Sequence, residues 1–275
     1  MSDDIFRQMR EFIYQQTGIY FLDNKKYLLE GRLAKRVQVL NLNDFESYYQ
    51  LIKFGTARQV ELKHLYDAVT INETFFFRNE PQFDAFEHTL VPQIVAARRN
   101  ETQRPLRVWS AASSSGEEAH TLGMIFLEKL KPLHPWLTME IVGTDISPGV
   151  LEIAKQGIYR EYSVRNMPRL YLEKYFQTDG TRYHIDDKVR SLVRFEHLNL
   201  FDRPRMRLMS RFDVIFCANV LIYFDAKSKI QVVSDLYDAL NPGGYLFIGY
   251  AESLHGISSA FKLINFPKTV AYKKE

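Results

Sequence analysis

The first seventy residues place apolar side chains at the three- and four-residue spacing of amphipathic helices. Helices are predicted in this way over residues 3–17, 24–40, 44–53 and 57–69. Gly18 is the expected stop of the first helix, and Asp44 and Thr56 are the expected N-caps of the last two. Because no strand pattern interrupts the series, we predict a helical N-terminal domain over residues 1–69.

Residues 70–80 form the predicted linker to the rest of the chain, yet the sequence is aromatic and lacks Gly, Pro and Ser. Apolar side chains in a connection are expected to pack onto something, so we place this segment against a binding cleft rather than in solvent. A helix is predicted from Pro81 to about residue 98, with Pro92 breaking or kinking it partway.

From about residue 105 the pattern changes to apolar strands that alternate with amphipathic helices. The first predicted strand begins at about Leu106. The other predicted strands cover residues 139–145, 211–219, 245–250 and 269–273. This alternation predicts an α/β domain with a mainly parallel, Rossmann-like sheet over residues 81–275, with the last strand antiparallel to a neighbour. Residues 177–198 alternate differently, and we predict a small antiparallel β subdomain there.

The stretch from Arg107 to Gly123 reads as a buried strand, a turn of small residues and a helix. Its turn, Ser110 to Gly116, would let a ligand approach the backbone at the N-terminus of the following helix. Free N–H groups and the positive end of the helix dipole favour cofactor binding there. Strand, turn and helix together are typical of the cofactor-facing corner of a doubly wound sheet.

Carboxylates at this corner indicate which cofactor it takes. Glu117 and Glu118 suit the helix dipole, but they would repel a diphosphate and attract a positively charged ligand. Asp145, at the end of the second strand, can grip both ribose hydroxyls, a device that NAD enzymes also use, so Asp145 alone does not decide. The dinucleotide fingerprint of glycines is absent from positions 111–115, which favours S-adenosylmethionine over a dinucleotide.

Four polar residues fall at or just beyond predicted strand ends, namely Asp145, Asn199, Asn219 and Glu252. Each alone could cap a loop. In a parallel sheet, however, the carboxyl ends of the strands meet at one edge, where ligands bind. Their shared placement therefore predicts one site at this edge.

Basic residues recur on the polar side of the second predicted helix. They are Lys25, Lys26, Arg32, Lys35 and Arg36, and their spacing puts most of them on one exposed stripe. A solvated helix face and a docking face for an acidic partner both remain open on this pattern.

Composition narrows the class of protein further. A formal net charge of +3 over 275 residues gives no general argument for nucleic acid. With Cys217 as the single cysteine, an internal disulfide is impossible, which favours a reducing compartment. No signal peptide or long apolar run is visible, and the histidines lack metal-ligand spacing. We expect a cytoplasmic monomer without membrane insertion, nucleic acid or metal.

Taken together, these motifs resemble the chemotaxis receptor glutamate O-methyltransferases, the CheR family. The resemblance covers nearly the whole chain. It rests on Thr70–Arg78, Val108–Glu118, Gly143–Ile146, Gly157–Tyr159, Asn199–Leu200, Phe212–Phe224 and Leu240–Tyr245.

The resemblance implies roles for the residues that match these motifs. The implied cofactor-binding residues are Asn72, Thr74, Arg78, Glu118, Asp145, Asn199, Leu200, Asn219 and Val220. Among them, Glu118 would take the methionine amino group, Asp145 the ribose, and Asn199 with Leu200 would flank the adenine. Arg78 and Tyr223 are the implied residues for orienting the reacting groups, and Arg32, Lys35 and Arg36 fall on the implied receptor-docking face.

The implied reaction is methyl transfer from S-adenosylmethionine to glutamate side chains of chemoreceptors, giving γ-glutamyl methyl esters. The chain departs from the family in two places: Ala218 stands where an arginine is usual, and Gly249-Tyr-Ala-Glu252 replaces Gly-His-Ser-Glu. The hairpin near 177–190 is short, and some members use it to hold a receptor C-terminal pentapeptide, so we expect a tether-independent enzyme. The alternatives are a cofactor-binding signalling module without turnover and a carboxyl methyltransferase for another substrate.

Overall fold

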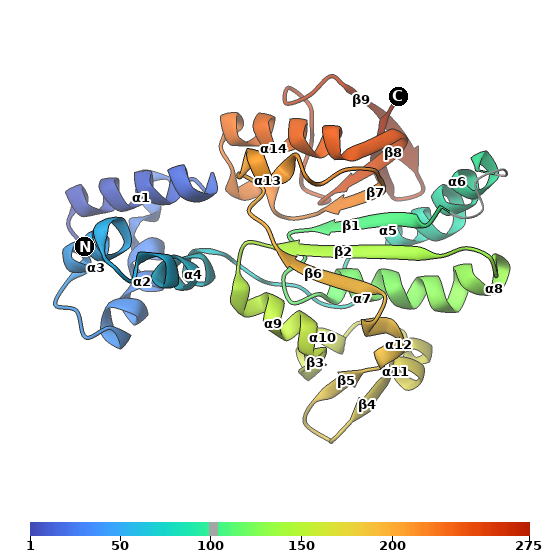
Figure 1. The fold of residues 1–275 in the computed structure, drawn as a ribbon, viewed down its shortest axis with the longest axis horizontal. Coiled ribbons are helices and arrows are strands. Elements are labelled where there is room, and N and C mark those ends of the chain that lie inside the picture. Colours follow the sequence, from blue (N-terminus) through green and yellow to red (C-terminus); the bar gives the residue numbers. More distant parts are fainter. Residues whose placement is uncertain (99–103) are drawn as a thin grey trace.

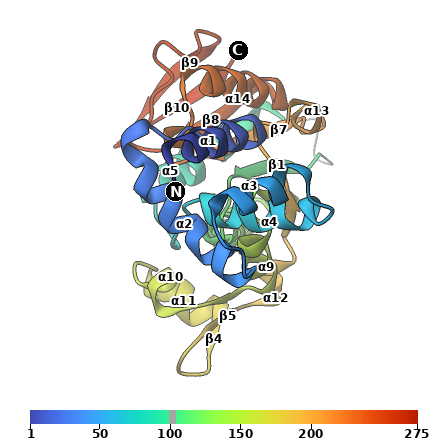
Figure 2. The ribbon, with the colours of Figure 1, turned by 90° about the vertical axis from the view of Figure 1, so that its left-hand side faces the viewer.

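The computed structural model describes residues 1–98 and 104–275, and its elements form a helical part and a sheet-containing part. Figure 1 shows the parallel strands β1 (Leu106–Ala111) and β2 (Met139–Asp145) ending toward the N-terminal helices. In Figure 2, viewed from that side, these helices lie in front of the sheet. One hydrophobic core joins the two parts, because Leu29 and Leu33 belong to the same cluster as Trp109.

The helical N-terminal domain is confirmed. It contains α1 (Asp3–Thr17), α2 (Lys26–Val39), α3 (Phe45–Phe54) and α4 (Arg58–Val69), with a 3-10 turn, Asp23–Lys25, before α2. Gly18 ends α1 at a φ of 73°, and the Asp44 carboxylate caps α3 by accepting from the Ser47 amide. The N-cap predicted at Thr56 is wrong. Ala57 precedes α4 without a side-chain cap, because a turn at Gly55 moves the helix start one residue along.

The main sheet has seven strands in the order β6-β2-β1-β7-β8-β10-β9. The remaining strands are β6 (Val193–His197), β7 (Phe212–Cys217), β8 (Leu240–Ile248), β9 (Phe261–Phe266) and β10 (Thr269–Lys274). The first five strands in this order pair in parallel, and β10 is antiparallel to both β8 and β9, as predicted for the last strand. Because β2 and β7 lie on opposite sides of β1, the strand order reverses there, and ligands bind outside the carboxyl ends at such a point.

Helices cover both faces of this sheet. Alternate strand residues point to opposite faces, so Val108 joins the cluster under α7 (Glu117–Ile125) and Trp109 joins the cluster under α14 (Ala226–Ala239). The helices α5 (Glu80–Ala85), α6 (Val91–Ala97) and α9 (Pro148–Gln156) share the α7 face. The short α13 (Arg203–Met206) contacts α14 on the other.

Two prolines stand just after π-helical turns. The turn Phe86–Leu90 precedes Pro92 in α6, and the turn Phe126–Leu130 precedes Pro132 in α8 (Lys131–Leu133). A π turn shifts the hydrogen-bonding register, which lets the helix pass a residue that has no amide hydrogen. The break expected at Pro92 is therefore a local π turn, and the helix continues to Ala97.

The small antiparallel subdomain is present, but its predicted span needs correction. Its sheet has the order β3-β5-β4, from β3 (Ile158–Tyr159), β4 (Phe176–Thr178) and β5 (Tyr183–Ile185). Three short helices accompany it: α10 (Glu161–Val164), α11 (Arg169–Tyr175) and α12 (Asp187–Arg190). Residues 193–197, predicted as part of this subdomain, instead form β6 beside β2 in the main sheet, where Phe195 is buried.

Candidate cofactor and active site

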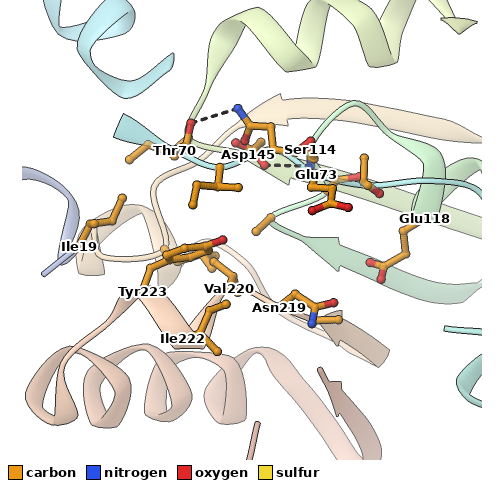
Figure 3. Close-up of a pocket in the computed structure, with 18 of the residues that line it drawn as sticks. Ile19, Thr70, Glu73, Ser114, Glu118, Asp145, Asn219, Val220, Ile222 and Tyr223 are labelled. Atoms are coloured by element: carbon orange, nitrogen blue, oxygen red, sulfur yellow. Dashed lines mark hydrogen bonds between the residues drawn. The ribbon is translucent and has the colours of Figure 1, made fainter. Parts of the chain in front are cut away.

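One pocket opens at the carboxyl edge of the sheet, between the α/β domain and the N-terminal helices. Among its lining residues are all ten that the resemblance implied for the cofactor and the reaction: Asn72, Thr74, Arg78, Glu118, Asp145, Asn199, Leu200, Asn219, Val220 and Tyr223. Figure 3 shows Glu118 and Asp145 facing Tyr223 and Val220 across this space. The pocket is therefore the place where the linker meets the end of β2, the segment after β6 and the loop after β7.

Strained backbone lies at the pocket in two places, the turn after β1 and the loop after β7. Ala112, Ser114 and Asn219 have φ values of 58°, 51° and 62°, and all three line the pocket. Positive φ is costly for residues other than glycine, and such strain gathers at functional sites. Ser113, in the turn after β1, also lines the pocket, and its hydroxyl is buried without a hydrogen-bond partner among the described residues.

Asp145 holds this turn in place while keeping its charge unpaired. Its two carboxylate oxygens accept from the backbone amides of Ser114 and Ser147, each at 2.9 Å. Burial raises its pKa to about 6, although these amide bonds act in the opposite direction. Among the described residues no lysine or arginine forms an ion pair with it.

Glu117 and Glu118, adjacent in sequence, point to different places. Glu117 is buried away from the pocket, where its oxygens accept from the hydroxyls of Ser115 and Ser163. Glu118 lines the pocket and accepts from the Ser110 hydroxyl at 2.7 Å. Burial of this carboxyl raises its pKa to about 7, against the lowering effects of Ser110 and the Arg78 charge. A cationic group bound beside Glu118 would favour the charged form of this carboxyl.

The linker lines one side of the pocket. The Asn72 amide donates to the Thr70 hydroxyl at 3.1 Å, and the Asn72 carbonyl accepts from the Ser114 hydroxyl at 3.1 Å. Arg78 donates to the backbone carbonyl of Glu73, so its guanidinium is not consumed by a carboxylate hydrogen bond. Its charge remains available to the pocket that it lines.

The loop after β7 is held from beneath by Glu252. One oxygen of this carboxylate accepts from the amides of Asn219 and Gly249, at 3.0 and 2.6 Å, and the other accepts from Ile222 at 3.1 Å. A Cβ at Gly249 would lie 2.8 Å from the Asn219 amide nitrogen, so the approach requires glycine. The Glu252 carboxylate thereby positions the strained Asn219 and the segment that leads to Tyr223.

The N-terminal domain supplies a wall that the sequence did not reveal. Thr17 and Ile19 line the pocket. Their segment is fixed by the Asn199 amide, which donates to the Gln16 carbonyl at 2.7 Å, and by the Tyr20 amide, which donates to the Tyr223 carbonyl at 3.0 Å. Only the stop at Gly18 marks this region in the sequence, and a helix stop carries no sign of a long-range contact.

A second contact joins the two parts at α9. The Asp67 carboxylate of α4 accepts from the Ser147 hydroxyl at 2.6 Å and from the Gly149 amide at 3.0 Å. A carboxylate at a helix N-terminus is favourable for the helix dipole. This contact sets α4, and hence the start of the linker, against the end of β2.

The exposed basic stripe expected on α2 is wrong for two of its members. Arg36 makes two hydrogen bonds to the buried Glu61 carboxylate, at 2.9 and 2.7 Å, and Arg32 donates to the Val69 carbonyl. The Arg36 side chain is directed inward because Glu61 offers a buried partner. Lys35 is exposed. The docking role predicted for these residues stays a prediction, and Lys35 is the best placed to serve it.

The described residues hold no group of three or more histidine, cysteine or acidic side chains suited to a metal ion. Of the helices within residues 1–98 and 104–275, none combines the length and apolar character needed to cross a bilayer.

Comparison with known proteins assigns the chain to a family. The profile of the CheR methyltransferase SAM-binding domain matches residues 72–270, and that of the CheR methyltransferase all-alpha domain matches residues 4–70. Chemotaxis protein methyltransferase 2 of Vibrio cholerae serotype O1 is 38% identical, over 100% of this chain and 94% of the relative. The Vibrio parahaemolyticus chemotaxis protein methyltransferase is 35% identical over 99% and 98%, and that of Borreliella burgdorferi 30% over 100% and 95%. The chain therefore belongs to the CheR methyltransferase family, and its cofactor is S-adenosylmethionine.

Proposed function

We propose that this chain methylates glutamate side chains of chemoreceptors, forming γ-glutamyl methyl esters in the cytoplasm. The single observation that carries the proposal is the pocket in which Glu118 and Asp145, without carboxylate-cation hydrogen bonds, face Tyr223 and which Arg78 also lines. Its relatives named chemotaxis protein methyltransferase support the receptor as the substrate. We propose that the chain acts as a monomer.

The pocket residues fit S-adenosylmethionine at each of its polar groups. Glu118 would pair with the α-ammonium group, and Asp145, already positioned by two amides, would accept from the ribose hydroxyls. Asn199 and Leu200 would flank the adenine, while Asn72, Thr74, Asn219 and Val220 would complete the walls.

Bound S-adenosylmethionine would supply a methyl group activated by its sulfonium. The methyl group would bond to a glutamate oxygen, and S-adenosylhomocysteine would leave with the electron pair of the broken sulfur–methyl bond. A glutamate carboxylate is ionised at neutral pH, so the chain needs no general base. Its residues must hold that carboxylate roughly 3 Å from the methyl group, in line, and exclude water. Arg78 and Tyr223 are the residues placed to orient it.

Lys35 is the side chain of α2 that we propose for docking an acidic receptor surface. It is exposed, whereas Arg36 is engaged by Glu61. An exposed cation of this kind contributes mainly to encounter and orientation, and its effect falls with salt.

A methyl-transfer assay tests the proposed function. The protein is mixed with methyl-labelled S-adenosylmethionine and membranes that contain chemoreceptors, and the product is treated with mild base. Label released as methanol identifies a carboxyl methyl ester, and mass spectrometry of receptor peptides then locates it on glutamate. Base-stable label on another residue type would contradict the proposal.

Ala218 favours a second candidate, a signalling module that binds the cofactor without turnover. It lines the pocket where the family usually has an arginine, so a contact made by that arginine is missing or supplied elsewhere. Calorimetric binding of S-adenosylmethionine without label transfer to any receptor membrane would favour this candidate. Ala218→Arg would then be the variant to test for gain of turnover.

A further inference from the structure

Arg32 lies on α2 among residues expected to face a receptor, yet its guanidinium is turned inward. Its Nη1 donates to the Val69 carbonyl at 2.5 Å, and its Cζ lies 5.8 Å from the centre of the Phe21 ring. Burial lowers the pKa of this side chain, which marks a partly desolvated charge. Arg32 therefore connects α2 with two other segments of the N-terminal domain.

The first of these segments is the end of α4, where the linker begins. Val69 is the last residue of α4, and the final carbonyls of a helix have no partner within it. A cation there also suits the negative end of the helix dipole. Val69 and Thr70 both line the pocket, so the bond from Arg32 holds part of the pocket wall.

Hydrogen bonds continue from this point to the cofactor corner. Asn72 donates to the Thr70 hydroxyl at 3.1 Å, Ser114 donates to the Asn72 carbonyl at 3.1 Å, and the Ser114 amide donates to Asp145 at 2.9 Å. Figure 3 shows the positions of Thr70, Ser114 and Asp145 around the pocket. A shift at Val69 would therefore reach the carboxylate proposed to bind the ribose.

The second segment, which contains Phe21, runs beside Tyr223. The Tyr20 amide donates to the Tyr223 carbonyl at 3.0 Å, and Ile19 pairs with Phe224 as an isolated bridge. Burial raises the pKa of the Tyr223 hydroxyl, and the charges of Arg32 and Arg78 act to lower it. The Arg32 charge thus acts on a residue that lines the pocket.

We propose that Arg32 is a positioning residue of the cofactor pocket, holding the start of the linker and the segment with Phe21 in place, rather than a receptor-docking residue. The inference rests on the proposed cofactor site, but it does not depend on which group accepts the methyl. Lys35, on the same helix and exposed, provides a matched comparison. Substitution of Arg32 should therefore affect cofactor binding, whereas substitution of Lys35 should affect receptor docking.

Titration calorimetry with S-adenosylhomocysteine, without receptor, tests this separation. We expect Arg32→Met, which keeps most of the aliphatic stem, to weaken binding at least tenfold. Arg32→Lys should recover part of the loss, because its ammonium can still donate to Val69. Lys35→Met should stay within twofold of the wild type. With receptor membranes, Arg32→Met should raise the KM for S-adenosylmethionine and Lys35→Met the KM for receptor.

Wild-type affinity in Arg32→Met, with a raised receptor KM, would overturn the inference and return Arg32 to the docking face. If circular dichroism shows that Arg32→Met does not fold, Arg32→Lys is the deciding variant. Unchanged affinity for S-adenosylhomocysteine together with an unchanged KM for S-adenosylmethionine in Arg32→Lys would overturn the inference. Weakened affinity in the folded Arg32→Lys variant would support it. If the wild type itself does not bind S-adenosylhomocysteine, the proposed cofactor site fails and this inference fails with it.

Discussion

Buried carboxylates occur at both ends of the parallel strands, here called the amino edge and the carboxyl edge of the main sheet, and their surroundings differ. At the amino edge, Asp213 on β7 accepts from Arg98, from Arg104 at 3.4 Å, from the Asn241 amide at 2.6 Å and from the Arg107 backbone amide at 2.9 Å. At the carboxyl edge, Asp145 accepts only from backbone amides among the hydrogen bonds found in the described residues.

The difference separates a structural carboxylate from one available to a ligand. Asp213 is surrounded by donors that stabilise its charge. Burial raises the pKa of Asp145 to about 6 and that of Glu118 to about 7, so both charges are costly in the ligand-free protein. A cationic or hydroxylated ligand would offset this cost, which is what the proposed cofactor provides.

The largest expected effect comes from breaking the amino edge. Asp213→Ala leaves Arg98 and Asn241 without their shared acceptor in a buried setting, and we expect the free energy of unfolding to fall by about 3 kcal/mol. Urea denaturation measures this change. Asp145→Ala is the matched control, and an equal loss of stability in both variants would contradict the comparison.

Arg78 provides the next test, because it is a cation of the carboxyl edge whose side chain hydrogen-bonds a carbonyl rather than a carboxylate. We expect Arg78→Ala to lower kcat by about 100-fold through lost orientation, with little change in melting temperature. Arg98→Ala should show the reverse, with lower stability and unchanged turnover per folded molecule. Near-normal turnover in Arg78→Ala would remove this residue from the mechanism.

Asp145→Asn should weaken S-adenosylhomocysteine binding by roughly tenfold or more, since hydrogen bonds to a charged group contribute about 1.5–3 kcal/mol. The same variant removes an unpaired buried charge but also replaces one of the two amide acceptors with an NH2 donor, so these effects oppose each other and the ligand-free protein should unfold at nearly the same temperature at pH 7.5. Calorimetry and thermal denaturation measure the two quantities. Loss of both affinity and stability would indicate that Asp145 is mainly structural.

A further test concerns stability as a function of pH. The folded pKa of Glu118, about 7, lies above its ordinary value of 4.5, so the folded state retains a proton that the unfolded state releases. The stabilisation is complete below pH 4.5 and is lost as pH rises to about 7. We expect the wild type, compared with Glu118→Gln, to lose stability over this window in melting experiments without ligand. Parallel profiles would show that the Glu118 pKa is not raised.

The sequence predicted the parts of the fold and site that local patterns encode. Helical spacing gave the N-terminal domain, and small residues after an apolar strand marked the turn at Ser110–Gly116. Polar residues after strands located Asp145, Asn199 and Asn219 at one edge, because parallel strands end together.

Long-range contacts explain what the sequence did not predict. Period-two alternation at residues 193–197 cannot say which sheet the strand joins, and β6 joins the main one. Arg32 falls on the polar stripe of α2, but its partner Val69 lies 37 residues away. Likewise, nothing local marks Ile19 as a wall of the pocket. The strand β9, with only partly buried and exposed residues, was not predicted.

The central claim is that Glu118 and Asp145 hold the cofactor as carboxylates, and proton release on binding tests it most directly. We would titrate the protein with S-adenosylhomocysteine at pH 6.5 in buffers of different ionisation enthalpy. With pKa values of about 7 and about 6, binding should release roughly one proton per site, and Glu118→Gln should remove most of it. Binding without proton release, or release unchanged in Glu118→Gln, would contradict the account.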